Sequence, residues 1–155
     1  MKRIILSAFT LLLIFVLTSF TSDNSTTKPT EKVRYYAYGY TWSNRDLNGK
    51  SENGSDGVAY VSNVTSFTVD RYSTTSSESI RAWNYANNQA DRNFAESFES
   101  HYSKAIYSTY YSGGVNGVYI SETREEVEKR RRKTIADYKS DDAIVRYFNS
   151  YEVYD

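Results

Sequence analysis

The chain has 155 residues, no cysteine, and 19 basic side chains balanced by 19 acidic ones. This length suits one domain with its own core, and an aromatic content of 16% favours a folded chain over a disordered one. The lack of cysteine excludes disulfides, a thiol nucleophile and a thiolate metal site, and the balanced charge argues against a general affinity for nucleic acid.

Residues 1–21 have the pattern of a secretory signal peptide. Two basic residues precede an apolar run from Ile4 to Leu17, and small polar residues follow that run. We predict cleavage within residues 19–22, and therefore a secreted or periplasmic protein with no membrane span after cleavage. Because no A-x-A motif marks the site, the alternative is an uncleaved N-terminal membrane anchor, although the run is shorter than the roughly 20 residues of a full span.

Residues 22–32 form a predicted flexible leader, because they are rich in Ser and Thr and contain the single proline of the chain. One domain is predicted for residues 33–155. It begins with a strand from Val33 to Trp42, in which successive side chains face opposite sides of a sheet. One side carries mostly small residues, and the other carries four large rings: Tyr36, Tyr38, Tyr40 and Trp42.

These four rings are the predicted binding residues. Exposed aromatic side chains on a sheet stack on sugar rings or contact peptides, and a contiguous apolar patch marks an interface. The prediction requires the helices to cover the opposite face, which carries the small residues. The alternative is that the rings pack in the core beneath a second layer.

A polar connection, residues 43–57, follows the first strand. Asn44, Asp46, Asn48 and Gly49 repeat the start of a calcium-binding loop, but the twelfth position is Ser55 where such a loop needs Glu. A solvated loop is therefore predicted, with an irregular cation site as the alternative.

Val58 to Asp70 is the second predicted strand, because it is rich in β-branched and aromatic residues. Asn63, near its middle, indicates a bulge or an edge position. The two strands are expected to form an antiparallel hairpin.

A long amphipathic helix is predicted next. Thr75 and Glu78 are spaced as a capping box, and Gly113 and Gly114 are expected to end the helix. A kink is expected because a straight helix of this length would exceed the width of the domain. Apolar residues mostly recur every three or four positions and predict a buried stripe: Ile80, Trp83, Ala86, Ala90, Phe94, Phe98, Tyr102, Ala105 and Ile106.

The last part of the domain is a predicted strand, helix and strand, at residues 117–120, 121–139 and 143–154. Thr123 and Glu126 form a second capping box at the start of this helix. A connection of this kind returns the chain to the same sheet, and we expect two parallel neighbouring strands with the helix on one face.

Five consecutive basic residues, 129–133, lie on this second helix. Glu125, Glu126 and Glu128 each precede a basic residue by four positions, the order that favours ion pairs on a helix. A solvated, salt-bridged helix is therefore predicted, and binding of phosphate, an acidic glycan or an acidic lipid is the alternative.

His101, the only histidine, borders the apolar stripe of the first helix and is predicted to be structural. No serine near it in sequence has the setting of a nucleophile. Two carboxylate pairs remain as candidates for catalysis, Glu96 with Glu99 and Asp141 with Asp142. Glycoside hydrolysis needs two carboxylates about 5–10 Å apart across a cleft, which sequence spacing does not establish.

The predicted fold is α+β: a two-layer sandwich in the order ββαβαβ, with a four-stranded mixed sheet and both helices on one face. The predicted function is a small exported binding or interaction module for a protein, peptide or glycan. One alternative is a cofactor-free hydrolase that uses carboxylates, with His101 as a participant. The other is a structural or assembly protein of the cell envelope. No catalytic residue, metal ligand or cofactor is predicted.

Overall fold

The computed structural model describes residues 31–43, 47, 57–103 and 115–154. The predicted signal peptide, most of the leader and the calcium-like spacing in the first loop lie outside these residues. The described residues form five strands and two helices: β1 (Glu31–Ser43), β2 (Val58–Ser62), β3 (Thr65–Arg71), α2 (Ser76–Tyr102), β4 (Val115–Ser121), α4 (Arg124–Ser140) and β5 (Ile144–Phe148).

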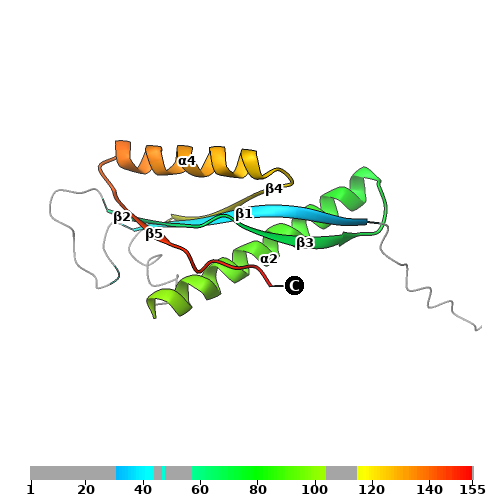
Figure 1. Ribbon diagram of the computed structural model, residues 1–155, viewed down its shortest axis with the longest axis horizontal. Helices are drawn as coiled ribbons and strands as arrows, with labels where there is room; N and C mark the ends of the chain where they lie inside the picture. Colours follow the sequence, from blue (N-terminus) through cyan, green and yellow to red (C-terminus); the bar gives the residue numbers. More distant parts are fainter. Residues whose placement is uncertain (1–30, 44–46, 48–56, 104–114, 155) are drawn as a thin grey trace, which may run out of the picture.

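The sheet is built around β1, its longest strand (Figure 1). One edge of β1 pairs with β3 along its first half and with β2 along its second half, both antiparallel. The other edge pairs with β4, again antiparallel, and β5 adds to β2 in the parallel direction. The predicted α+β fold with a mixed sheet is confirmed, with five strands where four were predicted, and the sheet is open.

The fifth strand arises because a bulge divides the predicted strand Val58–Asp70. Tyr40 pairs with Val61 and Ala37 with Thr65, so four steps along this strand oppose three steps along β1. The extra residue lies at the Asn63 region, as the sequence predicted. Counted as one interrupted strand, β2 and β3 give the predicted order ββαβαβ.

The two helices lie on opposite faces of the sheet, so the prediction that both cover one face was wrong (Figure 1). α2 packs on the face of Val33, Tyr35 and Ala37, whereas α4 packs on the face of Tyr38. The physical reason is that both faces of β1 carry apolar surface, so each needs a covering helix to remove it from water. The result is three layers, with the sheet in the middle.

The connection from β4 through α4 to β5 also differs from its prediction. β4 and β5 run in the same direction but are not neighbours, because β1 and β2 lie between them. α4 therefore crosses over two strands of the sheet. This path places it above the tyrosines of β1.

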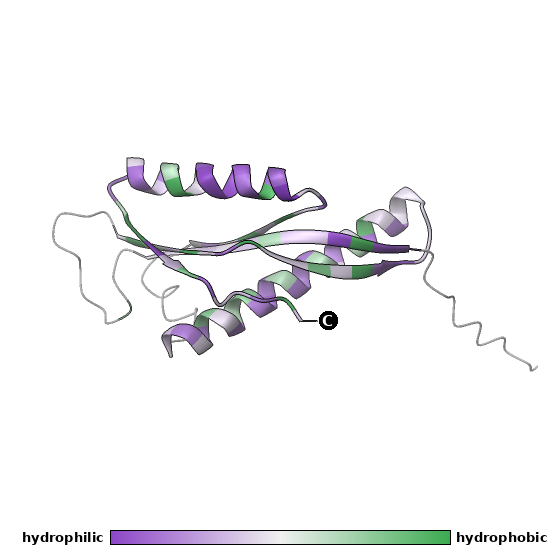
Figure 2. Cartoon of the chain, viewed as in Figure 1, coloured by the Kyte–Doolittle hydropathy of each residue, from purple (hydrophilic) through white to green (hydrophobic). Residues whose placement is uncertain are grey.

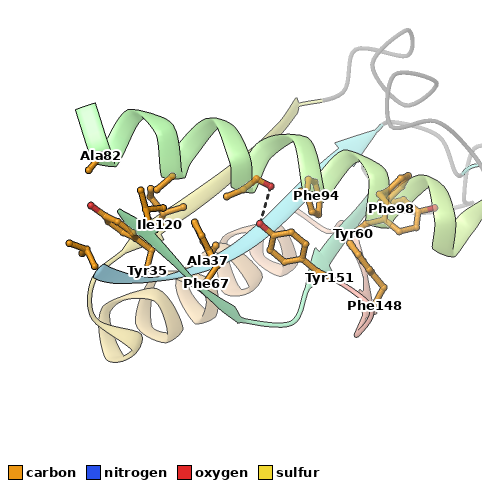
Figure 3. Close-up of a cluster of buried hydrophobic side chains, with 14 of the residues drawn as sticks. Tyr35, Ala37, Tyr60, Phe67, Ala82, Phe94, Phe98, Ile120, Phe148 and Tyr151 are labelled. Atoms are coloured by element: carbon orange, nitrogen blue, oxygen red, sulfur yellow. Dashed lines mark hydrogen bonds between the residues drawn. The ribbon is translucent and has the colours of Figure 1, made fainter. Parts of the chain in front are cut away.

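The main core lies between the sheet and α2 (Figure 3). Phe94 meets Phe148 and Tyr151 with ring centroids 5.7 and 5.6 Å apart, and the Tyr151 hydroxyl donates to the Ala90 carbonyl at 3.0 Å. Gly39 of β1 lies directly beneath Phe94, since a Cβ there would be 2.0 Å from the ring. The aromatic cluster thus depends on a strand residue with no side chain.

The predicted start of α2 is confirmed, whereas its end and the buried positions of its first turns differ from the prediction. The Thr75 hydroxyl accepts from the Glu78 amide, so the predicted N-cap is confirmed. The helix ends at Tyr102, where Ser103 has a left-handed φ of 52°. At the first turns the predicted stripe was wrong, because Ile80 and Trp83 are 60% and 45% exposed and Ala82 is the buried residue.

Candidate ligand-binding groove

The predicted binding residues of β1 lie beneath or beside α4. Tyr38 is 1% exposed, and its hydroxyl pairs with the Thr134 hydroxyl of α4 at 2.8 Å. Burial is the main cause that raises the pKa of Tyr38. Tyr36, Tyr40 and Trp42 are half-buried. The four rings therefore do not form the open face that the sequence predicted, because α4 covers its centre.

Another part of the surface is open. A groove of about 410 Å³ lies between the edge of the sheet at β3 and the first half of α2. Thr68, Asp70 and Tyr72 line it from the β3 side, and Glu78, Tyr85 and Gln89 line it from the helix. Helical spacing explains the wall formed by α2, because positions 78, 85 and 89 are seven and four residues apart and therefore share one face of the helix.

Two large rings give the groove its apolar character. Tyr72 is 46% exposed and Tyr85 58% exposed, although both belong to a residue type that buries its ring well. The buried side chains of Val69 and Ala82 also line the groove. Concave sites that combine aromatic surface with a few polar groups are the usual form of a ligand site.

The charges around the groove balance. Lys32 and Arg81 contribute two cations, and Asp70 and Glu78 contribute two anions. Arg81 and Glu78 also lie 3.4 Å apart as an ion pair. The groove therefore does not select a ligand by net charge, which favours a neutral or mixed-charge ligand over a phosphate or a polyanion.

Gln89 is the polar group at the inner end of the groove. It is 4% exposed, and its Nε2 donates to the carbonyl oxygen of Tyr154. Its Oε1 is buried and has no hydrogen-bond partner in the described part of the chain. A buried amide oxygen without a donor costs free energy, so this position favours a ligand that brings an N–H or O–H group.

His101 lies in a second hollow, farther along α2. Its Nδ1 is 3.1 Å from the Ser150 hydroxyl. Sequence spacing could not predict this contact, because the two residues are far apart along the chain. Glu96 and Glu99 are exposed on the same helix, and among the described residues no carboxylate forms an ion pair with His101. An exposed Ser–His contact without an orienting acid lacks the arrangement of a catalytic triad.

α4 is hydrophilic over most of its length (Figure 2). Its described ion pairs are Arg124 with Glu128 and Lys133 with Asp137, which are not the three pairs that the sequence predicted. Glu126 instead accepts from the hydroxyls of Ser121 and Tyr119, both at 2.6 Å. The predicted cap is also absent, since the Thr123 side chain accepts no backbone hydrogen bond.

Arg131 is tied to the sheet. Its Nε donates to the carbonyl oxygen of Ser62 at 2.6 Å, and its guanidinium lies 5.8 Å from the centre of the Tyr147 ring. One of the five consecutive basic residues therefore holds α4 against β2 and β5 and does not belong to an open anion-binding patch.

Comparisons with protein-family models, with curated proteins and with solved structures gave no match. Neither α2 nor α4 in the described chain is long and apolar enough to cross a bilayer. Within the same residues, no three histidine or acidic side chains gather as metal ligands would.

Proposed function

We propose that this chain is a small exported binding module and that its ligand occupies the groove between β3 and α2. The N-terminal pattern of residues 1–21 supports export. The groove supports binding, because it combines exposed rings, balanced charges and a buried polar group in one concavity.

The observation that carries the proposal is the pair of half-exposed rings, Tyr72 and Tyr85, which line the groove near the buried Gln89 amide. Covering such rings removes apolar surface from water at roughly 25 cal/mol per Å². A ligand that also donates a hydrogen bond to Gln89 Oε1 would remove the free-energy cost of burying that oxygen without a partner. Both gains occur only when the groove is filled.

The groove favours a binding module over the hydrolase alternative. Its two carboxylates, Asp70 and Glu78, have no histidine beside them in the lining, and Glu78 is paired with Arg81. The assembly alternative predicts a different result, namely an oligomer that covers a sheet edge in the purified protein.

The proposal is tested by titrating the ¹⁵N-labelled exported protein with soluble oligosaccharides and with a mixed set of short peptides. We expect amide shifts for one of these ligand classes at residues 68–72 and 78–89. Tyr85→Ala should weaken that binding about tenfold, because an aromatic contact contributes roughly 1–1.5 kcal/mol. Tyr147→Ala is the matched control, since Tyr147 is 48% exposed and lies outside the groove.

Shifts that map only to Tyr36 and Trp42, or that do not respond to Tyr85→Ala, would overturn the groove as the site. No shift with either ligand class would overturn it as well.

Export is tested separately by the intact mass of the protein recovered from a bacterial expression host. We expect an N-terminus within residues 19–22 and recovery in the soluble extracytoplasmic fraction. A mass that retains residues 1–18, with the protein in the membrane fraction, would support the uncleaved anchor instead.

A further inference from the structure

We infer that the ligand of this groove is an extended polypeptide segment that lies along the outer edge of β3. The inference rests on the proposed function and names the class of ligand. Three features carry it. The first is a strand edge without a neighbouring strand. The second is a segment of this same chain held in the trough between α2 and β3, of which the groove is the open end, and the third is the unpaired oxygen of Gln89.

The first feature is the edge of β3. Among the described strands, β3 pairs only with β1, so its other edge has no strand beside it. A strand edge presents a row of backbone N–H and C=O groups that pair with an added chain. Residues 69–71, which lie beyond the part of this edge that borders Val153 and Tyr154, provide about 10 Å of such an edge at roughly 3.3 Å per residue, enough for about three ligand residues.

The second feature is the C-terminal segment, residues 149–154, which follows β5 and runs beside α2 (Figure 1). It also reaches β3, because Val153 and Tyr154 line a hollow together with Ser66, Phe67 and Thr68. The trough between α2 and β3 is thus filled by this segment at one end and open at the other.

This segment is held through its backbone by side-chain amides. Asn63 accepts from the Tyr151 amide and donates to the Tyr151 carbonyl, both at 3.0 Å. Asn93 accepts from the Tyr154 amide at 3.3 Å, and Gln89 donates to the Tyr154 carbonyl. The walls of the trough therefore recognise the repeating amide group of an extended peptide rather than one particular side chain.

The third feature lies where the filled and open parts meet. Gln89 uses its Nε2 for the chain's own Tyr154, while its Oε1 has no partner among the described residues. A backbone N–H is the donor that matches an amide oxygen, and a peptide carries one at every residue except proline. A peptide that continues past Tyr154 would supply it.

A glycan is the competing ligand, since Tyr72 and Tyr85 could stack on sugar rings. A sugar would use the rings but lacks the alternating backbone N–H and C=O groups of an extended peptide that match the β3 edge and the side-chain amides of α2. A glycan accounts for the rings and, through a hydroxyl group, for the Gln89 oxygen, whereas the peptide also accounts for the strand edge and for the way the C-terminal segment is held.

The test begins with a phage-displayed library of random 12-residue peptides selected on the intact exported protein. Selected peptides are synthesised, and their affinity is measured by fluorescence anisotropy. Each peptide amide is then N-methylated in turn. A strand added to β3 predicts that every second methyl group weakens binding at least tenfold and that the methyl groups between them change it less than twofold, because alternate amides face the sheet.

Two protein variants accompany the scan. Gln89→Met should weaken the peptide about fivefold, since it removes an amide partner, and Asn88→Met is the matched control because Asn88 is an exposed neighbour outside the groove lining. Tyr85→Ala should weaken it about tenfold. Thermal unfolding of each variant identifies any loss of fold, and the N-methyl scan needs no variant at all.

The outcomes separate the two proposals. Alternating sensitivity together with the Tyr85→Ala effect supports the peptide. Selected peptides that show no alternation, or that bind Tyr85→Ala as tightly as the wild type, overturn it. If an oligosaccharide shifts the groove amides and no peptide does, the groove remains the binding site and the peptide is rejected. If neither ligand class binds there, both proposals fail.

Discussion

Gly39 shows how one residue without a side chain sets the packing of the larger core. It lies at the centre of β1, pairs with Val118 of β4, and has the Phe94 ring against its Cα. The Gly39 amide also donates to the Ser62 hydroxyl at 2.8 Å beside the bulge. The absence of a side chain therefore lets the helix approach β1 closely at this position.

We expect Gly39→Ala to lower the free energy of unfolding by about 1–3 kcal/mol, because the added methyl group forces the Phe94 ring and its neighbours to move. Chemical denaturation in urea measures the change. Gly117→Ala is the matched control in the adjacent strand, since a Cβ there would be 3.1 Å from the Tyr40 hydroxyl at the end of a ring that can shift. Equal losses for the two variants would contradict this account of the core.

At the scale of single elements, Glu126 links the start of α4 to β4. The hydroxyl of Ser121, and then that of Tyr119, donate to its carboxylate and lower its pKa below the ordinary value. A carboxyl group whose pKa is lower in the folded state stabilises the fold above its unfolded pKa of about 4.3 and loses that effect as the pH falls.

Glu126→Gln should therefore melt at a lower temperature than the wild type at pH 7, and the difference should shrink steadily below about pH 4. Melting curves by circular dichroism between pH 2.5 and pH 7 measure it. Glu125→Gln is the control, because Glu125 is an exposed carboxylate in the same turn of α4. A constant difference across this pH range would show that the hydroxyl contacts do not stabilise the charged form.

The elements that sequence could predict are those with a local signal. The capping of α2 by Thr75, the bulge at Asn63 and the strands on either side of α4 each follow from residue type and spacing within a few positions. The face of the sheet that α4 covers does not follow from any such local signal. Alternation in β1 separates large rings from small residues, but a row of tyrosines is compatible both with solvent and with a covering helix.

The groove could not be predicted because it joins elements distant in sequence. Tyr72 lies in the turn after β3, Tyr85 lies on the exposed side of α2, and Gln89 receives its partner from the end of the chain. One local signal was available, since Tyr85 falls outside the apolar stripe of its helix. A large ring off the buried stripe favours a second, exposed contact surface.

For the whole molecule, the tyrosines that fill both cores link stability to alkaline pH. Burial is the main cause that raises the pKa of Tyr38 under α4, of Tyr138 on α4 and of Tyr151 under α2. A group whose pKa is raised in the folded state stabilises the fold fully below its unfolded pKa, about 10 for tyrosine, and loses that effect as the pH rises further. Above this pH, the unfolded chain ionises tyrosines that the folded protein keeps neutral.

We therefore expect the free energy of unfolding to fall steeply above about pH 10, with each buried tyrosine contributing up to roughly 1.4 kcal/mol per pH unit. Tyr151→Phe removes one such group together with its hydrogen bond to Ala90, so it should be less stable than the wild type at pH 8 by about 1 kcal/mol. Urea denaturation from pH 8 to pH 11 should show the two proteins approaching each other above pH 10, because only the wild type loses the contribution of Tyr151. Parallel curves would mean that Tyr151 ionises as readily in the folded protein as in the unfolded chain, and that its ring is not held in the dry core between β5 and α2.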